Sequence, residues 1–236
     1  MQNKVFSYID RQQMLMPGME VLVGFSGGAD STALLLLLKE YGEKHEIGVR
    51  AVHVHHGIRG ESADRDQAFC AKFCQKRGIP FRMYRRDVPA YAAAHHMSLE
   101  EAGREVRYEI FSRCLEDGFG ERVALAHHQN DQAETMLFRL SRGTGLRGLC
   151  GMEPVRLPYI RPLLCVTRQE VTDWLVSRHI SWVEDESNQE IEYARNRIRK
   201  TILAPMEAAW PGTVARLSGT AERLREAESY LEYETD

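Results

Sequence analysis

The segment from Ser26 to Ser31 has the composition of an anion-binding turn. It reads Ser-Gly-Gly-Ala-Asp-Ser, follows an apolar run that ends at Phe25, and opens a strongly helical stretch. Glycines let a backbone approach an anion closely, serines donate hydroxyl hydrogen bonds, and a helix N-terminus attracts negative charge. Asp30 suits such a turn if it holds Mg²⁺ that bridges phosphate groups. We therefore predict a phosphate-binding loop here, against the simpler alternative of an ordinary tight turn with a helix cap.

Two better-known nucleotide motifs do not account for this loop. The segment lacks the lysine of the P-loop pattern G-x-x-x-x-G-K-[ST]. The dinucleotide fingerprint G-x-G-x-x-G does occur between Gly143 and Gly148, but there it follows a predicted helix rather than a strand. We therefore expect no nicotinamide dinucleotide site.

The elements that must position the loop alternate along the chain. Short apolar runs predict strands at Val21–Phe25, Val49–His55, Phe81–Arg85 and Val123–Ala126. Helix-period stretches predict helices at Ser31–Tyr41, Ser62–Lys76, Leu99–Leu115 and Asp131–Ser141. This alternation predicts an α/β fold with a doubly wound, mostly parallel sheet and helices on both faces. In such a sheet the carboxyl ends of the strands meet at one edge, where ligands bind.

The second half of the chain is less regular. Residues Val155–Leu164 contain prolines and are expected to form an edge strand or a loop. Thr167 is expected to cap a helix that runs through Arg178, and an amphipathic helix from Thr213 to Tyr233 closes the chain. We place a soft boundary near residue 200, which separates a sheet-containing unit (1–200) from a short helical C-terminal extension (201–236).

The overall composition is that of a globular protein. Of 236 residues, 43% are hydrophobic and 28% are charged, and the net charge is −3 at pH 7. The apolar run Ala33–Leu38 is far too short to span a bilayer, and the N-terminus lacks the pattern of a secretory signal. The five cysteines form no C-x-x-C pair, which favours reduced thiols. We expect a cytoplasmic protein with no membrane partner.

Histidine-rich motifs end two of the predicted strands. Residues 53–56 read His-Val-His-His, and residues 127–131 read His-His-Gln-Asn-Asp before a predicted helix. Because strand ends converge in a parallel sheet, Asp131 and either His127 or His128 are expected near Asp30. A zinc site that combined these histidines with Cys70 and Cys74 is not indicated by their spacing.

The pattern S-G-G-x-D-S resembles the pyrophosphatase loop of the N-type ATP pyrophosphatases, which cleave ATP between the α and β phosphates. Together with further motifs in the same order, it resembles the tRNA(Ile)-lysidine synthetase family from about Val21 to Leu203. The further motifs are His53–Arg59, Glu101–Tyr108, Ala126–Thr135, Arg139–Met152, Arg161–Leu163, Trp182–Asn188 and Arg195–Arg199.

The chain departs from this family in two respects. Asn130 stands where the family usually has the first aspartate of an Asp-Asp pair, so we carry metal and catalytic roles over to Asp131 only. Many members also continue into C-terminal domains that grip tRNA, whereas this chain ends in an acidic helix. It is either a short form or a catalytic fragment.

The resemblance implies a defined reaction. ATP, with Mg²⁺, would adenylate the 2-oxo group of the wobble cytidine in the minor tRNA(Ile) with the anticodon CAU. Free L-lysine would then displace AMP through its ε-amine and give lysidine. Residues 1–200 would be the catalytic domain, residues 201–236 the start of a second domain, and a homodimer remains open.

The expected roles of individual residues combine their chemistry with this resemblance. Asp30 and Asp131 would hold Mg²⁺ and serve catalysis, with His127 or His128 accepting a proton from the lysine ammonium. The nucleotide would be bound by Ser26, Gly27, Gly28, Ala29, Asp30, Ser31, His53, Arg104 and Arg107. The tRNA would be contacted by Arg139, Arg142, Arg147, Arg195, Asn196 and Arg199.

Simpler roles remain open for the arginines. Arg104 and Arg107 share a helix face and either clamp phosphates or form salt bridges with Glu101 or Glu105. The basic group at residues 195–199 either contacts tRNA phosphates or is a solvated helix face. The glycine-rich stretch after Arg139 is expected to close over the substrate as a lid.

Two other functions compete with the ligase. A cytidine thiolase on the same loop would normally carry paired cysteines for a sulfur carrier or an iron–sulfur cluster, and Cys70-x-x-x-Cys74 lacks the usual spacing. A nucleotide-binding protein without catalytic activity is mildly favoured by Asn130 but disfavoured by the presence of both Asp30 and Asp131.

Overall fold

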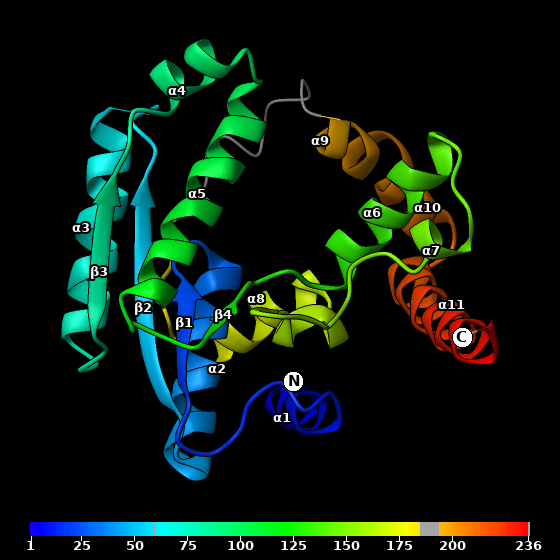
Figure 1. Cartoon of the computed structure of the whole chain (residues 1–236), viewed down its shortest axis with the longest axis horizontal. Helices are drawn as coiled ribbons and strands as arrows, with labels where there is room; N and C mark the ends of the chain where they lie inside the picture. Colours follow the sequence, from blue (N-terminus) through cyan, green and yellow to red (C-terminus); the bar gives the residue numbers. More distant parts are fainter. Residues whose placement is uncertain (59, 185–193, 236) are drawn as a thin grey trace.

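The computed structural model describes residues 1–58, 60–184 and 194–235, with the side chains of 61, 194, 195 and 235 left out (Figure 1). Its centre is one sheet with strand order β3-β2-β1-β4-β6-β5. The strands are β1 (Glu20–Gly24), β2 (Gly48–His55), β3 (Phe81–Arg85), β4 (Arg122–Ala124), β5 (Val155–Arg156) and β6 (Tyr159–Ile160). All neighbours are parallel except β5 and β6, which confirms the predicted doubly wound, mostly parallel sheet.

The first strand is central because it is apolar on both faces. Val21, Leu22 and Val23 are fully buried, as expected for a parallel strand covered on both sides. Val23 lies in register with Ala51 of β2 and with Ala124 of β4. The strands after β1 are added first on one side of it (β2, β3) and then on the other (β4), so the strand order reverses next to β1. In parallel α/β sheets, ligands bind at the carboxyl ends of the strands at such a point.

Helices cover both faces of the sheet and build two cores. One face carries α1 (Gln2–Arg11), α2 (Ala29–His45), α3 (Glu61–Gln75) and α8 (Arg168–Ser177), with side chains such as Leu34 and Leu37 in its core. The other face carries α4 (Val88–His95) and α5 (Leu99–Glu116), whose Ile110 and Phe111 pack onto Leu22. The helix α8 begins after the predicted cap Thr167, whose side chain accepts from the Glu170 N–H.

The remaining helices gather on the side of the sheet away from β3 (Figure 1). They are α6 (Gln129–Ser141), α7 (Leu146–Leu149), the 3₁₀ turn η1 (Pro162–Cys165), α9 (Ala194–Ile198), the π-turn η3 (Arg199–Leu203), α10 (Ala204–Ala209) and α11 (Thr213–Thr235). Ala133 of α6, Leu203 and Val214 form a small core there. The boundary expected near residue 200 falls inside η3, and the division into two domains stays a prediction.

No helix in the described part of the chain is long and apolar enough to cross a membrane.

Candidate active site at the carboxyl ends of the strands

The loop after β1 is closed by its own serines. The Ser26 N–H donates to Ser31 Oγ over 3.2 Å, and the two hydroxyl oxygens lie 3.1 Å apart. Ser31 Oγ also donates to the Gly28 carbonyl. The first N–H groups of α2 have no partner within the helix, which is the arrangement that suits an anion, and phosphate binding by this loop stays a prediction.

Gly27 is required by the packing around this loop. Its φ is +86°, and a Cβ there would lie 3.0 Å from Cys70 Sγ and 3.3 Å from Val183 Cγ2. The Val183 N–H donates to the Gly27 carbonyl over 2.9 Å. The loop is therefore held between α3 and a distant segment that sequence reasoning did not place beside it.

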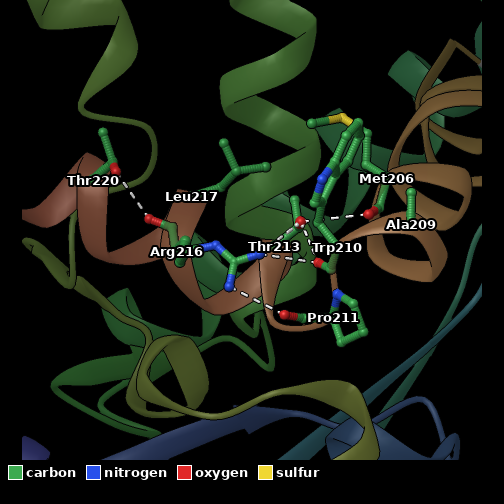
Figure 2. A pocket seen from close by; sticks show the side chains of 8 residues that line it. All are labelled: Met206, Ala209, Trp210, Pro211, Thr213, Arg216, Leu217 and Thr220. Atoms are coloured by element: carbon green, nitrogen blue, oxygen red, sulfur yellow. Dashed lines mark hydrogen bonds between the residues drawn. The ribbon is translucent and has the colours of Figure 1, made fainter.

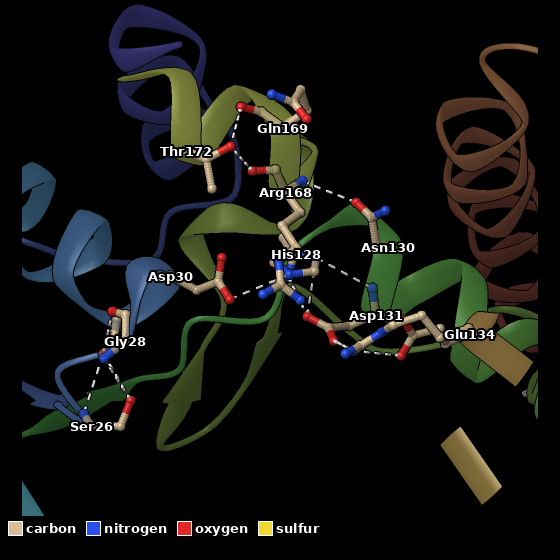
Figure 3. Close-up of polar contacts among 12 residues, drawn as sticks. Ser26, Gly28, Asp30, His128, Asn130, Asp131, Glu134, Arg168, Gln169 and Thr172 are labelled. Atoms are coloured by element: carbon tan, nitrogen blue, oxygen red, sulfur yellow. Dashed lines mark hydrogen bonds and ion pairs between the residues drawn. The ribbon is translucent and has the colours of Figure 1, made fainter. Parts of the chain in front are cut away.

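A histidine joins the two predicted metal ligands (Figure 3). His128 Nε2 lies 3.6 Å from Asp30 Oδ2 at the start of α2, and His128 Nδ1 lies 3.2 Å from Asp131 Oδ2 at the start of α6. The Asp131 carboxylate also accepts from the His128 N–H over 2.9 Å, which caps α6. The predicted meeting of Asp30, His128 and Asp131 is thus present in the structure.

The charges of this cluster reinforce one another. Burial by itself would lower the pKa of His128, but Asp131 and Asp30 outweigh it and raise that pKa above 6.5. Burial would raise the pKa of Asp131, whereas the neighbouring His128 ring and the Arg199 guanidinium lower it. His128 and Asp131 therefore each favour the charged form of the other.

Glu134 extends the cluster, and its role was not predicted from the sequence. It is 1% exposed and receives two hydrogen bonds from Arg199, from Nε over 2.6 Å and from Nη2 over 3.1 Å. Arg199 Nη2 also lies 3.8 Å from Asp131 Oδ1. Burial raises the pKa of Glu134 despite these bonds. Its position three residues after Asp131, on the same helix face, is the signal that could have found it.

The residues present fit a cation between Asp30 and Asp131. Asp30 Oδ1 is buried and has no hydrogen-bond partner among residues 1–58, 60–184 and 194–235. The described residues contain no group of three or more His, Cys, Asp or Glu side chains placed to hold a metal. Mg²⁺ needs no such group, because it binds through one or two carboxylates together with substrate phosphates and water.

Asn130 points away from the carboxylate cluster (Figure 3). Its Oδ1 accepts from the Arg168 N–H over 3.0 Å and so connects α6 to the first residue of α8. The Asn130 side chain links two helices, and it does not contribute to the cluster around Asp30 and Asp131.

The histidines that end β2 contact the loop from the next strand. His53 Nδ1 lies 2.9 Å from the Phe25 carbonyl, and burial lowers the pKa of His53. His55 is buried, with Nε2 3.2 Å from Asp64 Oδ1. These contacts favour a positioning role for both rings. Arg59, at the end of this motif, lies outside the described residues.

Arg104 and Arg107 of α5 are exposed. Arg104 lies over the Tyr108 ring, with Cζ 5.2 Å from the ring centroid. The Glu101 carboxylate, one of the partners considered for them, accepts instead from the Ser98 N–H and hydroxyl at the start of α5. The contacts of Arg104 and Arg107 with nucleotide or tRNA stay predictions.

The arginines expected to contact tRNA have different surroundings. Arg139 Nη1 donates to the carbonyls of Gly148 and Gly151, over 2.9 and 3.1 Å, and so holds its own loop. Arg142 and Arg147 are exposed, whereas Asn196 is half-buried. The side chain of Arg195 lies outside the described residues, as do residues 185–188 of the Trp182–Asn188 motif.

The chain is similar to known proteins over most of its length. Residues 2–206 match the PP-loop domain family. It is 38% identical over 226 residues to the tRNA(Ile)-lysidine synthase of Parabacteroides distasonis, covering 96% of this chain and 51% of the relative. It is 41% identical over 215 residues to that of Pseudomonas aeruginosa, covering 89% and 47%. The chain thus spans about half the length of these curated relatives.

A solved structure supports the fold. The U34-tRNA thiolase NcsA from Methanococcus maripaludis, described with its 4Fe-4S cluster, aligns with a TM-score of 0.77 at 23% identity. The alignment covers 95% of this chain and 77% of the thiolase. At this identity the likeness concerns the fold alone.

Proposed function

The chain belongs to the PP-loop family, and on that premise we propose that it carries the ATP-dependent chemistry of a tRNA(Ile)-lysidine synthase. The reaction would join free L-lysine to the wobble cytidine of the minor tRNA(Ile) with anticodon CAU, and release AMP and pyrophosphate. The observation that carries the proposal is the meeting of Asp30 and Asp131 across His128, in a chain similar to such synthases over 96% of its length.

The first step is adenylation of the base. The loop Ser26–Ser31 would bind the β and γ phosphates of ATP through hydroxyls and helix N–H groups. The cytidine 2-oxo oxygen attacks the α-phosphorus, the bond to the bridging oxygen breaks, and pyrophosphate leaves. Asp30 and Asp131 would hold Mg²⁺, which supplies positive charge against the charge that develops on the phosphates.

The second step is displacement of AMP. The neutral ε-amine of lysine attacks C2 of the base, the bond from C2 to the phosphate-bearing oxygen breaks, and AMP leaves. Free lysine is almost fully protonated at neutral pH, because its pKa is about 10.4, so a proton must be accepted near the nucleophile. We assign His128 to orienting the two carboxylates, since both of its ring nitrogens face them. His127 is then the candidate proton acceptor.

The tRNA would approach from the side of α6 and α9. Arg142 and Arg147 are exposed there beside a glycine-rich segment, where arginine side chains can reach phosphates. Arg139 would act indirectly by fixing the carbonyls of that segment. Such contacts position the tRNA and make its binding salt-dependent.

The competing functions have weaker support. Cys70 and Cys74 are fully buried, and burial raises the pKa of both thiols, that of Cys74 to about 12. The thiolate is the form that carries sulfur, and burial disfavours it in both residues. An inactive nucleotide-binding protein would have no use for the intact carboxylate–histidine cluster.

The test is release of pyrophosphate and AMP from Mg-ATP with unmodified minor tRNA(Ile), with and without labelled lysine. We expect pyrophosphate release that depends on the tRNA, AMP release that depends on lysine, and label on the tRNA. Release of pyrophosphate without lysine transfer would contradict the ligase and favour another nucleophile. Failure to release any pyrophosphate, by a folded protein that binds ATP, would favour the inactive nucleotide binder.

A further inference from the structure

The C-terminal helix α11 makes two kinds of arginine contact. Near its start, Arg216 borders a groove of about 670 Å³ and donates to two carbonyls five and six residues before it (Figure 2). Arg225, further along the helix, donates instead to the carbonyls of Cys150 over 2.6 Å and Met152 over 2.8 Å, which lie 75 and 73 residues before it. The first arginine closes a local turn, whereas the second joins α11 to the segment after α6.

The segment that Arg225 reaches forms the end of the short helix α7. This helix has four residues, Leu146–Leu149, and isolated helices of fewer than about 12 residues are barely stable in water. The direction of α7 therefore depends on contacts with its neighbours. Carbonyls at a helix C-terminus lack partners within the helix and carry partial negative charge, which suits arginine donors. Arg139 of α6 and Arg225 of α11 supply such donors to Gly148 and Cys150.

Gln132 of α6 binds the same two carbonyls as the arginine of α11. Its Nε2 donates to the Cys150 carbonyl over 3.3 Å and to the Met152 carbonyl over 3.1 Å, and its Oε1 accepts from the Met152 N–H over 2.7 Å. The approach is so close that a Cβ on Gly151 would lie 2.7 Å from Gln132 Oε1. Three side chains thus form a clamp on residues 148–152: Gln132, Arg139 and Arg225.

A second link joins α11 to the end of α7 through a side chain. Cys150 is buried, and its Sγ lies 3.1 Å from Glu228 Oε2. Burial and this hydrogen bond raise the pKa of the Cys150 thiol to about 11, so the thiol is protonated at pH 7 and can donate to the carboxylate. The helix α11 therefore holds this end of α7 through both a backbone carbonyl and a side chain.

The residues just before the clamp include two of the arginines expected to contact tRNA. Arg142 and Arg147 are exposed. In the part of the chain that the structure describes, no side-chain hydrogen bond joins residues 142–147 to α6 or α11. Arg147 belongs to the same helical turn as Gly148, whose carbonyl is held by the clamp. The direction in which Arg147 leaves the surface is therefore set by the clamp.

We propose that Arg225 is a positioning residue for tRNA binding, which holds α7 so that Arg147 faces a tRNA phosphate. The inference rests on the proposed function, in which Arg147 contacts tRNA. Arg225 is half-buried and donates to carbonyls, so it acts through α7 rather than on the nucleic acid. A side chain that is held before binding loses less conformational entropy on binding than a mobile one. Loss of Arg225 should thus weaken tRNA binding although no contact with tRNA is removed.

The test compares Arg225→Met with the unchanged chain in steady-state formation of lysidine on minor tRNA(Ile). Methionine keeps a flexible apolar side chain but removes both donated hydrogen bonds. We expect the KM for tRNA to rise about three- to tenfold, with kcat and the KM for ATP changed less than about twofold. The reason is that Arg225 has no hydrogen bond or ion pair to the carboxylate–histidine cluster in the described part of the chain.

A double-mutant cycle shows whether Arg225 acts through α7. Arg147→Ala alone should raise the KM for tRNA at least as much as Arg225→Met does. Adding Arg225→Met to Arg147→Ala should raise the KM by less than about a further twofold, because both changes remove the same phosphate contact. Effects that multiply in the double variant would overturn the proposal, since Arg225 would then contribute without Arg147.

The matched control is Arg223→Met, which removes the same charge from an exposed position on α11. It should leave the KM for tRNA unchanged. If Arg225→Met does not fold, Arg225→Lys replaces it. Lysine keeps the charge but has a single ammonium in place of the planar guanidinium, so a smaller rise in KM is expected, and an unchanged KM would overturn the proposal.

Amide hydrogen exchange of residues 146–152, without tRNA, tests the clamp separately from the function. Exchange should be faster in Arg225→Met than in the unchanged chain and in Arg223→Met. Faster exchange with an unchanged KM for tRNA would give Arg225 a structural role only and overturn the proposal. If the unchanged chain bound no tRNA while the exchange rates differed as expected, the clamp would stand but the proposed function would fail, and the positioning role with it.

Discussion

The carboxylate–histidine cluster and the glycine-rich segment after α6 are built on the same helix but organised differently. In the cluster, Asp30 and Asp131 come from two strand ends and face one histidine. In the segment, Arg139 turns back to the carbonyls of Gly148 and Gly151, while Arg142 and Arg147 are exposed. Strand ends bring distant residues to one place, whereas an arginine beside a loop can donate to the carbonyls of that loop instead of binding a ligand.

The largest effect is expected in the cluster. Asp30→Asn and Asp131→Asn each remove a charge but keep the side-chain shape, and in Asp131→Asn an oxygen remains to cap α6. We expect each to lower adenylation on the order of 10³-fold, because the charge on the phosphates loses its counter-charge. Pyrophosphate release measures the loss, and circular dichroism verifies the fold. Activity near that of the unchanged chain in either variant would exclude a metal role for that aspartate.

The glycine-rich segment should separate into structural and exposed arginines. Arg139→Ala removes two charge-assisted hydrogen bonds and should cost about 1–3 kcal/mol of unfolding free energy. Arg142→Ala is the matched control; it removes only the exposed contact of Arg142 with the Phe138 ring, at 5.2 Å, and should lower the free energy of unfolding by less than about 1 kcal/mol. It should instead weaken tRNA binding and reduce the slope of log affinity against log salt by about one. Chemical denaturation measures the stability of both variants, and filter binding at several salt concentrations measures their tRNA affinity. If Arg142→Ala lost the stability and Arg139→Ala the salt-dependent binding, the structural and tRNA-contacting roles would have to be exchanged.

The turn between α10 and α11 makes a smaller, pH-dependent contribution. Glu207 accepts from the N–H groups of Gly212 and Val214, over 2.6 and 2.8 Å, and these bonds lower its pKa below 4.5. A carboxyl with a lowered folded-state pKa stabilises the fold above its unfolded pKa, and this stability is lost as pH falls through the folded value. Glu207→Gln should therefore melt below the unchanged chain at pH 7 but not at pH 3. An equal difference at both values would exclude this mechanism.

The smallest effect is expected at Asn130. Asn130→Asp restores the residue usual in the family, and an aspartate oxygen can accept from the Arg168 N–H as the amide oxygen does. We expect the rate of pyrophosphate release to change less than about twofold, and the melting temperature to shift by about a few degrees at most. A large gain in activity would show that the carboxylate at this position acts in the cluster.

The features that could be predicted from the sequence are those that depend on local residue patterns. The strand Phe81–Arg85 and the cap Thr167 were predicted correctly, because period and capping chemistry are local. The helix Gln2–Arg11 was not predicted, although its buried residues Val5, Tyr8 and Ile9 recur at the i, i+3, i+4 spacing of an amphipathic helix and could have indicated it.

Other features depend on packing between distant segments and could not be read locally. Val183 contacts Gly27 across most of the chain, and Arg225 reaches the carbonyl of Cys150 only because α11 packs on α6 and α7. Glu134 lay within a recognised motif, but its pairing with Arg199 depends on how α9 and η3 return to α6. Side chains placed by strand ends were predictable, whereas those placed by helix docking were not.

Mass spectrometry of the tRNA itself tests the proposed joining of lysine to the wobble cytidine most directly. Minor tRNA(Ile) would be incubated with the chain, Mg-ATP and lysine, digested to nucleosides, and examined at the wobble position. We expect the cytidine to gain the mass of one lysine less one water, and Asp131→Asn to yield none of this product. A thiolated cytidine, or an unmodified cytidine despite pyrophosphate release, would contradict it.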